Sequence, residues 1–598
     1  MGVWKLVSKG RSRELFVLAS LIVYGTVYSI LGVMRFYSFN AYVYDLGLSS
    51  GLLYGAVHGG TLYFLQNPSQ ITFNKMIYLP LAILFQSYPN FVPLIIFQAF
   101  WVAFGSYALY RISLHVLGDT VLSIVPSLLY LLYFPISGAV WYDFHFQTLF
   151  PTFFFIGFWL YLSDRRLFSV LFMFLAAITN YLAAAVVFIF GLLVIYNDMS
   201  TTRKVKNRSY VIGLLLFPVI IVALVNMHYG MSYTTSVSNI FGFPGTLLIN
   251  IWYKFIFVFS ILAALLMFSF YSPKYLLLSL PYLIFMFFQG SHTPYYTPFG
   301  YQYAALYTPG IFISLVYGIS RYKARSVRRK TISSFKRSVG ILVAVNIALA
   351  LVLTPVGNEI TGSSFPYDTR QNTTYTAQDQ ALSSMMAMIP PGSSVLVQGN
   401  MPQLTVGYHW IVGYEFNGSN YPKYAINDPY NYLFNDTANI YLYNSSMEVK
   451  VFNDLLDSGM YGVLSEKYGI MLIELNYSGY TDFEPLQQTV NNVQVKSSAS
   501  GVFTLNWSSD FVAPGSYNVT VKLPDSAVTN ITFSVVGQNG TVTGYPMITW
   551  ENASGKFSSC MYSNGQSYSL NPNFSIRWIS ASGKENVSVA LSQVFPLR

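Results

Sequence analysis

Long apolar segments alternate with short polar loops through the first 357 residues of this 598-residue chain. An α-helix needs about 20 apolar residues to cross the ~30 Å hydrocarbon core of a bilayer. The predicted spans are residues 15–34, 91–110, 120–139, 147–162, 166–179, 181–196, 210–228, 251–270, 274–289, 304–320 and 339–356. The pattern therefore predicts a polytopic α-helical membrane bundle of about eleven transmembrane helices.

The apolar run 166–196 is too long for one straight span, because as a single helix it would measure about 45 Å. A hairpin that turns at Thr179-Asn180-Tyr181 gives two short spans instead. Four basic residues between positions 5 and 13 place the N-terminus in the cytoplasm by the positive-inside rule. With the hairpin, the basic loops 203–208 and 321–338 fall on that same side, so the charges favour the hairpin.

This topology leaves the chain after residue 357 on the extracytoplasmic side of the plasma membrane. Residues 358–479 combine a helical pattern at 381–388 with a strand pattern at 394–397, which predicts a mixed α/β domain. Residues 480–598 alternate apolar and polar positions between frequent turn residues, which predicts a β-sandwich. The expected domains are thus the bundle, 1–357, and two extracytoplasmic domains, 358–479 and 480–598.

Asn-x-Ser/Thr sequons concentrate in the region predicted to lie outside. Twelve follow residue 357 and one, at Asn207, precedes it. Glycosylation occurs only where its machinery reaches the chain, so this skew agrees with an outside location. The alternative is that a region rich in Asn, Ser and Thr collects sequons by chance. The candidate acceptors are Asn372, Asn417, Asn435, Asn444, Asn476, Asn506, Asn518, Asn530, Asn539, Asn552, Asn573 and Asn586.

Composition agrees with a membrane protein. Charged residues make up 9% of the chain, against about 25% in soluble domains, and hydrophobic residues make up 53%. The net charge is +10, but the basic residues lie in short loops between apolar runs. We therefore expect contact with anionic membrane lipid and no nucleic-acid partner. The single cysteine, Cys560, excludes an intrachain disulfide and a CxxC metal site.

Ionisable and polar side chains gather at the ends of the spans predicted to face outside. The candidates are Asp45, His58 and Lys75 in the loop 35–90, Asp143 and His145 after the third span, Asn180 and Tyr181 at the hairpin turn, and His292 and Tyr301 in the loop 290–303. Charged groups near a membrane core are costly, so such a gathering predicts a functional cavity at the outer surface.

Each candidate also has a structural interpretation. Asp45 could be the N-cap of a following helix, and Asp143 and His145 could hydrogen-bond loop backbone. Structural roles are favoured for the two loop histidines. Arg35 and Lys254 suit snorkelling anchors at helix ends. Alternatively, either side chain could meet a lipid phosphate, as could Lys75 in the loop 35–90.

The familiar nucleotide and hydrolase motifs are missing from usable positions. The sequence has no Walker loop, GxGxxG, HExxH or GxSxG in a suitable context. Nucleotide sugars and ATP are cytoplasmic, so chemistry at the outer face would need a donor carried by lipid.

Several stretches resemble an uncharacterised family of prokaryotic membrane proteins, domain of unknown function 2079. The stretches are 44–48 (YDLGL), 79–81 with 88–89 and 97–98, 143–145 (DFH), and 452–456 with 461–464 and 469–473. Their order and spacing carry the resemblance, which covers about residues 15–475. The region after about 480 has no counterpart in it.

The family is similar to the GT-C superfamily of glycosyltransferases, which implies a multi-helix bundle with a long first outer loop and a polyprenyl-phosphate sugar as donor. The resemblance implies that Asp45 is the catalytic carboxylate, and that Asp143 and His145 orient the acceptor or hold Mg²⁺ or Mn²⁺. The sequence departs from the pattern at Asn74 and at the hairpin turn 179–181, where relatives tend to carry a histidine and a Lys-Glu-Asp run respectively.

Three functions follow as hypotheses. The first is an integral membrane glycosyltransferase that uses a polyprenyl-phosphate sugar at the extracytoplasmic face. The second is a non-catalytic surface protein on a degenerate bundle, with a surface-layer or glycoprotein partner. The third is a transporter, which would place polar residues at mid-span or pair broken helices.

Overall fold

The computed structural model describes residues 2–58, 76–85, 91–205, 207–229, 245–289, 293–367, 369–428, 451–452, 454–456 and 458–485, and the backbone of nine strands from 487 to 595. The chain divides into two compact units, which are described separately. The first is essentially residues 1–374 and the second essentially residues 375–598.

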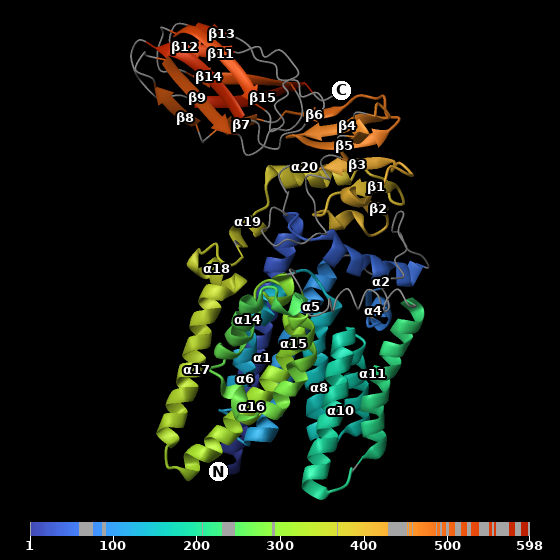
Figure 1. Ribbon diagram of the computed structural model, residues 1–598, viewed down its shortest axis with the longest axis vertical. Coiled ribbons are helices and arrows are strands. Elements are labelled where there is room, and N and C mark those ends of the chain that lie inside the picture. The colour runs from blue at the N-terminus through green and yellow to red at the C-terminus, as the bar shows by residue number, and fades with distance from the viewer. Residues whose placement is uncertain are drawn as a thin grey trace. The chain divides into compact units, whose positions relative to one another are not determined.

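Helices make up the first unit (Figure 1). They are α1 (Gly2–Tyr37), α2 (Leu48–His58), α4 (Tyr78–Phe85), α5 (Phe91–Leu117), α6 (Ile124–Leu132), α7 (Phe134–Trp141), α8 (Phe150–Leu162), α9 (Arg166–Ala177), α10 (Tyr181–Thr202), α11 (Arg208–Tyr229), α13 (Gly245–Leu248), α14 (Ile251–Ala263), α15 (Leu280–Phe287), α16 (Ala304–Arg328), α17 (Ile332–Leu353), α18 (Pro355–Thr361) and α19 (Thr369–Thr373). Short helical turns are η1 (Val43–Gly47), η3 (Phe146–Leu149), η4 (Phe268–Tyr271), η5 (Pro273–Ser279) and η6 (Thr293–Tyr296).

Four helices of the described chain are long and apolar enough to cross a membrane. They are Arg11–Tyr37 of α1, α5, α10 and α17, and a fifth span arises if α6 and α7 are counted as one. Five further apolar helices are shorter, with 10–17 residues each. The expected eleven spans are therefore not confirmed, although helices occupy the predicted apolar segments.

The third predicted span is broken between α6 and α7, which meet at a bend of 49°. Pro135 lies in the first turn of α7, where it lacks the N–H that a continuous helix would use and its ring would clash with the preceding turn. Tyr133 is extended at the break. By contrast, the predicted hairpin at 166–196 is confirmed, because α9 ends at Ala177 and α10 begins at Tyr181.

The helix α16 is the most deeply buried long helix of the described bundle, with nearly all residues from Ala304 to Ile319 inside. It packs along η4 and η5, and the Ser314 Oγ lies 2.7 Å from the carbonyl oxygens of both Ser269 and Ser272, which share its one hydrogen. A β-carbon on Gly318 would collide with the carbonyl oxygen of Phe268, so glycine allows this close approach.

A six-stranded mixed sheet forms the described core of the second unit, with strand order β2-β1-β3-β5-β4-β6. Its strands are β1 (Ser394–Val397), β2 (His409–Val412), β3 (Tyr424–Asn427), β4 (Tyr461–Lys467), β5 (Ile470–Leu475) and β6 (Asp482–Glu484). The helix α20 (Ala377–Met386) packs on β4 and β5 and begins with a capping box at Thr376 and Asp379.

Two further sheets follow, with strand orders β13-β12-β10-β15-β7 and β11-β14-β9-β8. Their strands are β7 (Gln487–Val490), β8 (Val493–Ser497), β9 (Val502–Ser508), β10 (Ser516–Lys522), β11 (Val528–Val536), β12 (Thr549–Asn552), β13 (Gly555–Phe557), β14 (Asn573–Ser580) and β15 (Ser588–Phe595). The chain passes repeatedly from one sheet to the other, as in β-sandwiches. The side chains of these strands are outside the described part, so the packing of a sandwich core stays a prediction.

Candidate functional site

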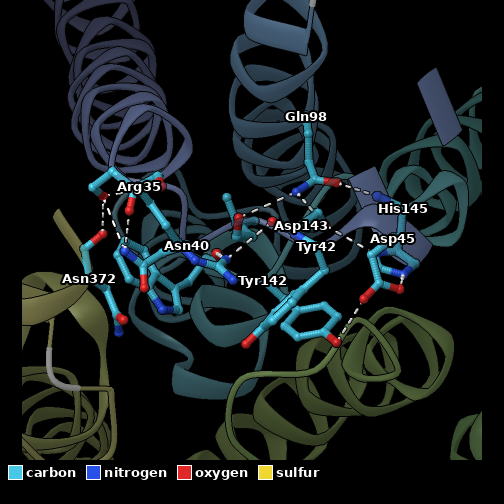
Figure 2. A network of polar contacts seen from close by, with 12 residues as sticks. Arg35, Asn40, Tyr42, Asp45, Gln98, Tyr142, Asp143, His145 and Asn372 are labelled. Carbon is cyan, nitrogen blue, oxygen red and sulfur yellow. Dashed lines mark hydrogen bonds and ion pairs between the residues drawn. The ribbon is translucent and has the colours of Figure 1, made fainter. Parts of the chain in front are cut away.

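A polar network lies where the chain leaves α1 and where it leaves α7 (Figure 2). The two segments are 38–47 and 142–145, and they are joined directly. The backbone N–H of Tyr42 donates a 2.6 Å hydrogen bond to Oδ2 of Asp143. This contact brings the Tyr-Asp-Leu-Gly segment and the Asp-Phe-His segment, which are about 100 residues apart in sequence, into one site.

Arg35 is the cation of this network. Its Nη1 lies 3.4 Å from Oδ1 of Asp143, and it also donates to the backbone carbonyl of Trp141. The guanidinium carbon lies 5.3 Å from the ring centroids of both Tyr42 and Trp141. The side chains of the ion pair are only 5–6% exposed. Arg35 is therefore a buried partner of Asp143 and not a snorkelling anchor.

Burial has an electrostatic consequence at Asp143. Desolvation raises the pKa of this carboxyl to about 6, although the neighbouring Arg35 and the Tyr42 N–H act in the opposite direction. The charge of Asp45 adds to the upward shift. The two carboxylates therefore interact, and Asp143 takes up a proton at a higher pH than an exposed aspartate does.

Asp45 is held by two donors. Its Oδ1 lies 2.8 Å from Nε2 of His145, and its Oδ2 accepts a 2.9 Å hydrogen bond from the Tyr142 hydroxyl. The side chain of Asp45 is 16% exposed, whereas that of His145 is 4% exposed. Asp45 lies within η1 and not at the start of α2, so its interpretation as an N-cap is wrong.

Both ring nitrogens of His145 face oxygen acceptors. Nδ1 lies 3.0 Å from the carbonyl oxygen of Asp143, and Nε2 faces the carboxylate of Asp45. A neutral imidazole has one donor and one acceptor, so it satisfies only one of these contacts. With its hydrogen on Nε2, the ring donates to Asp45, and Nδ1 then lies beside the Asp143 carbonyl without donating to it. The geometry therefore favours the tautomer in which His145 orients the Asp45 carboxylate.

Gln98 on α5 fixes the turn after α7, which carries Asp143 and His145. Its Oε1 accepts hydrogen bonds from the backbone N–H of His145 at 2.9 Å and from the Thr148 hydroxyl at 2.8 Å. Its Nε2 donates to the carbonyls of Val140 at 3.3 Å and Asp143 at 3.4 Å. All four interactions of one buried amide hold the turn after α7 against α5.

Aromatic rings surround the Asp45–His145 contact. The Tyr142 ring stacks on His145 with centroids 5.5 Å apart and also packs against Tyr301 at 5.4 Å. Burial, followed by Tyr295 and the charge of Asp45, raises the pKa of Tyr303. Tyr301 is the described candidate from the loop 290–303, and the structure brings it to this site.

Other candidates lie elsewhere or have structural roles. Asn180 caps α10, accepting from the Leu182 N–H at 2.8 Å, and donates to Gln147. Tyr181 packs on Phe285, and His58 is exposed and stacked on Tyr54. Lys254 is buried and donates to the Phe287 carbonyl at 2.9 Å, so it does not snorkel. Lys75 and His292 lie outside the described residues.

Three sequons can be compared by their side chains. The amide of Asn372 donates a 2.7 Å hydrogen bond to the Tyr367 carbonyl, whereas Asn417 and Asn476 are exposed. The side chains of Asn506, Asn518, Asn530, Asn552 and Asn573 are outside the described part, as are the residues Asn435, Asn444, Asn539 and Asn586 entirely. Their glycosylation stays a prediction.

The donor set does not suit a divalent metal in this arrangement. Among the described residues, no three His, Cys, Asp or Glu side chains converge as metal ligands would. Asp45 already meets His145 and Tyr142, and Asp143 already meets the Arg35 guanidinium. Mg²⁺ or Mn²⁺ would have to displace these donors, so the residues present do not fit a bound metal ion.

Sequence reasoning found Asp45, Asp143 and His145 but missed Gln98, Tyr142 and the role of Arg35. Gln98 is a polar residue inside an otherwise apolar span, which is the usual signal of a buried hydrogen-bond site. Arg35 lies at the predicted end of its span. There the sequence does not distinguish a buried ion-pair partner from a cation that snorkels to the membrane interface. Tyr142 carries no signal of its own in a chain with 49 tyrosines.

Apolar helices of membrane-spanning length, with a buried polar network at the ends of α1 and α7, define a helical membrane protein with a candidate functional site. The chain belongs to the family of predicted membrane proteins known as DUF2079, whose model matches residues 35–472. The match includes the polar network and the six-stranded sheet as far as residue 472, within β5. No curated protein matches the sequence.

Proposed function

We propose that this protein is an integral membrane glycosyltransferase that transfers a sugar from a polyprenyl-phosphate donor to an acceptor at the extracytoplasmic face. The observation that carries the proposal is the Asp45–His145 contact of 2.8 Å. It presents a partly exposed carboxylate, positioned by buried partners, at the end of an apolar helix bundle. This is the arrangement expected of a general base that serves a lipid-linked substrate.

The proposal includes the topology. The N-terminus lies in the cytoplasm, the bundle crosses the membrane about eleven times, and the chain after residue 357 is extracytoplasmic. α1 would then end on the outer side. The shorter helices would cross together with neighbouring turns, as η5 would with α15 over the apolar segment Pro273–Phe287. A GT-C-like bundle of this kind is supported by the resemblance of the outer loops and not by the number of long helices.

The reaction needs one displacement. An acceptor hydroxyl attacks the anomeric carbon of the donor sugar, and its O–H bond breaks as Asp45 takes the proton. The new glycosidic C–O bond forms while the bond from the anomeric carbon to the phosphate oxygen breaks, and its electron pair leaves with polyprenyl phosphate. A single displacement inverts the anomeric configuration. His145, Tyr142 and Gln98 are positioning residues for Asp45.

The leaving phosphate gains negative charge and would be stabilised by a cation. Arg35 and Lys254 are engaged with backbone carbonyls inside the bundle, which does not favour either as the phosphate ligand in this conformation. Lys75 remains a phosphate candidate from the sequence.

The proposal is tested by sugar transfer in purified protein reconstituted in lipid nanodiscs. Polyprenyl phosphates with radiolabelled glucose or mannose are supplied together with the glycoproteins and glycolipids of the host membrane as acceptors, and the loss of label from the lipid is followed. Asp45→Asn keeps the size of the side chain but cannot accept the proton. We expect transfer to fall by about 10²–10⁴-fold, the usual contribution of a general base.

The matched control is Asp119→Asn. Asp119 accepts from the backbone N–H groups of Val121 and Leu122, and asparagine can do the same. This variant should keep wild-type transfer. Unchanged transfer by Asp45→Asn would remove Asp45 as the base. A wild-type protein that releases no label from either donor would contradict the enzyme proposal.

A non-catalytic surface protein is the second candidate. The specific observation in its favour is that Arg35 and Asp143 neutralise each other inside the network. In this function the network only joins the two loops, and the second unit binds a surface-layer or glycoprotein partner. The functions differ in one result, because only the enzyme releases sugar from the lipid.

A further inference from the structure

A second polar cluster lies in the six-stranded sheet, apart from the network in the bundle. The strands β1, β2 and β3, labelled in Figure 1, run parallel, with β1 between the other two. The chain therefore leaves β1 for β2 on one side and afterwards reaches β3 on the other side. In open α/β sheets, ligands bind at the carboxyl ends of parallel strands where the strand order reverses in this way.

Three polar side chains follow these carboxyl ends. β1 ends at Val397 and is followed by Gln398 and Asn400, and β3 is followed by Asp428. Gln398 accepts a 2.8 Å hydrogen bond from the Asp428 N–H, and the Asn400 amide lies 3.5 Å from the Asp428 carboxylate. The exposed fractions are 4% for Gln398 and 1% each for Asn400 and Asp428. The polar edge is therefore buried.

Two buried atoms of this cluster have no hydrogen-bond partner among the described residues. They are the donor Nε2 of Gln398 and the acceptor Oδ1 of Asn400. Amide flips do not remove the problem, since Oε1 of Gln398 is needed for the Asp428 N–H and Nδ2 of Asn400 faces the Asp428 carboxylate. Buried polar groups are nearly always paired, because leaving one unpaired costs stability.

The orphaned atoms select the chemistry of a ligand. The ligand must accept from Gln398 and donate to Asn400, and a hydroxyl group does both. A free anion would meet the Asp428 carboxylate and the Asn400 oxygen, which repel it. A metal cation would suit those oxygens but would face the amide hydrogens of Gln398. Neighbouring hydroxyl groups of a neutral ligand can accept from Gln398 and donate to Asn400 and to the Asp428 carboxylate.

We propose that Gln398, Asn400 and Asp428 form a binding site for a neutral carbohydrate. The ligand lies at the carboxyl edge of β1 and β3, where adjacent hydroxyls pair with the two amides and the carboxylate. The site does not depend on the glycosyltransferase proposal, because it involves none of the residues of the bundle network. It exists equally in an enzyme and in a non-catalytic surface protein.

The test uses the full-length protein in lipid nanodiscs, which avoids sugar detergents, made in a host without N-glycosylation. Saturation-transfer NMR and calorimetry are carried out with glucose, galactose, mannose, N-acetylglucosamine and inositol. We expect saturable binding of at least one. Gln398→Glu keeps the acceptor for the Asp428 N–H but removes the orphaned donor, so it should weaken binding about tenfold or more.

The matched control is Gln380→Glu, the same change at an exposed position of α20 in the same unit. It should leave binding unchanged. If Gln398→Glu fails to fold, Asn400→Ala measures the loss of the second orphaned atom. If none of the five probes binds saturably, water alone occupies the site and the proposal is overturned. The proposal is also overturned if a folded Gln398→Glu or Asn400→Ala variant binds sugar with wild-type affinity, or if the site binds calcium in place of sugar.

Discussion

The network contains two acid–base pairs with different environments. Arg35 and Asp143 are buried together, while the Asp45 side chain keeps some exposure beside His145. Removing one partner of a buried ion pair typically costs about 3–5 kcal/mol, because the other charge is left uncompensated. The first pair therefore holds the two loops together. The second pair has the exposure that chemistry requires.

Asp143 should make stability depend on pH in an unusual direction. Its folded-state pKa is about 6 because of burial, whereas an unfolded aspartate titrates near about 3.9. Between about pH 4 and 6 the folded protein thus holds a proton that the unfolded chain has lost. The contribution of Asp143 to stability therefore falls as the pH rises through this window, by up to about 3 kcal/mol.

This prediction is measured as the melting temperature of wild type minus that of Asp143→Asn from pH 4 to 7.5. The variant removes the titrating group, so the difference should decline with rising pH and become flat above about 6 to 7. Asp164→Asn, at a highly exposed position, should show no such trend. A difference that grows with pH would mean that Arg35 lowers the pKa of Asp143 more than burial raises it.

At the scale of elements, α16 depends on glycine for its packing. Gly318 faces the backbone of Phe268, and Gly310 faces Ser279 at the start of α15. Ser279 in turn donates a 2.7 Å hydrogen bond to the carbonyl of Tyr307 on α16. The irregular segment η4–η5 therefore lies against the helix through small residues and backbone hydrogen bonds, which helps to bury α16.

Gly318→Ala should destabilise the bundle. The added methyl group would collide with the Phe268 carbonyl, and forced overpacking usually costs about 1–3 kcal/mol. Gly340→Ala on α17 is the matched control, since a β-carbon there meets no atom within 4 Å. Alanine favours a helix over glycine, so this variant should be neutral or slightly stabilising. Equal melting temperatures for the two variants would contradict the packing.

The sequence predicted those elements that depend on local pattern. Apolar runs located the helices, and the turn at Asn180 followed from span length and charge. Asp45, Asp143 and His145 stood out because charge is rare near apolar spans. Their pairing could not be predicted, because the bonds to Arg35, Tyr142 and Gln98 join residues far apart in sequence. The break at Pro135 has a local cause, because proline cannot continue a helix, but hydrophobic periodicity does not register it. The short α14 depends on packing.

At the scale of the whole molecule, the family match separates two parts of the chain. Residues 35–472 contain the bundle network and the carbohydrate-site residues 398–428. The nine strands from 487 onward lie beyond the match. The features proposed to act on sugars therefore lie in the part that the family model matches, and the β-rich region lies outside it.

The topology can be tested with the native cysteine. Cys560 is the one cysteine of the chain, so no background mutation is needed. We expect a membrane-impermeant maleimide to label it in intact cells, because residues after 357 are predicted to lie outside. Reactivity in detergent provides the control. Protection in cells together with reactivity in detergent would reverse the proposed orientation and place the Asp45 site in the cytoplasm.

The central claim is that the Asp45–His145 site receives a lipid-linked sugar. The most direct measurement is a cryo-electron microscopy structure of the protein in nanodiscs with a polyprenyl-phosphate sugar, prepared as Asp45→Asn to prevent turnover. The account predicts lipid phosphate and sugar density beside position 45, with the anomeric carbon facing this side chain. A well-resolved map with the site closed and the lipid bound elsewhere would contradict it.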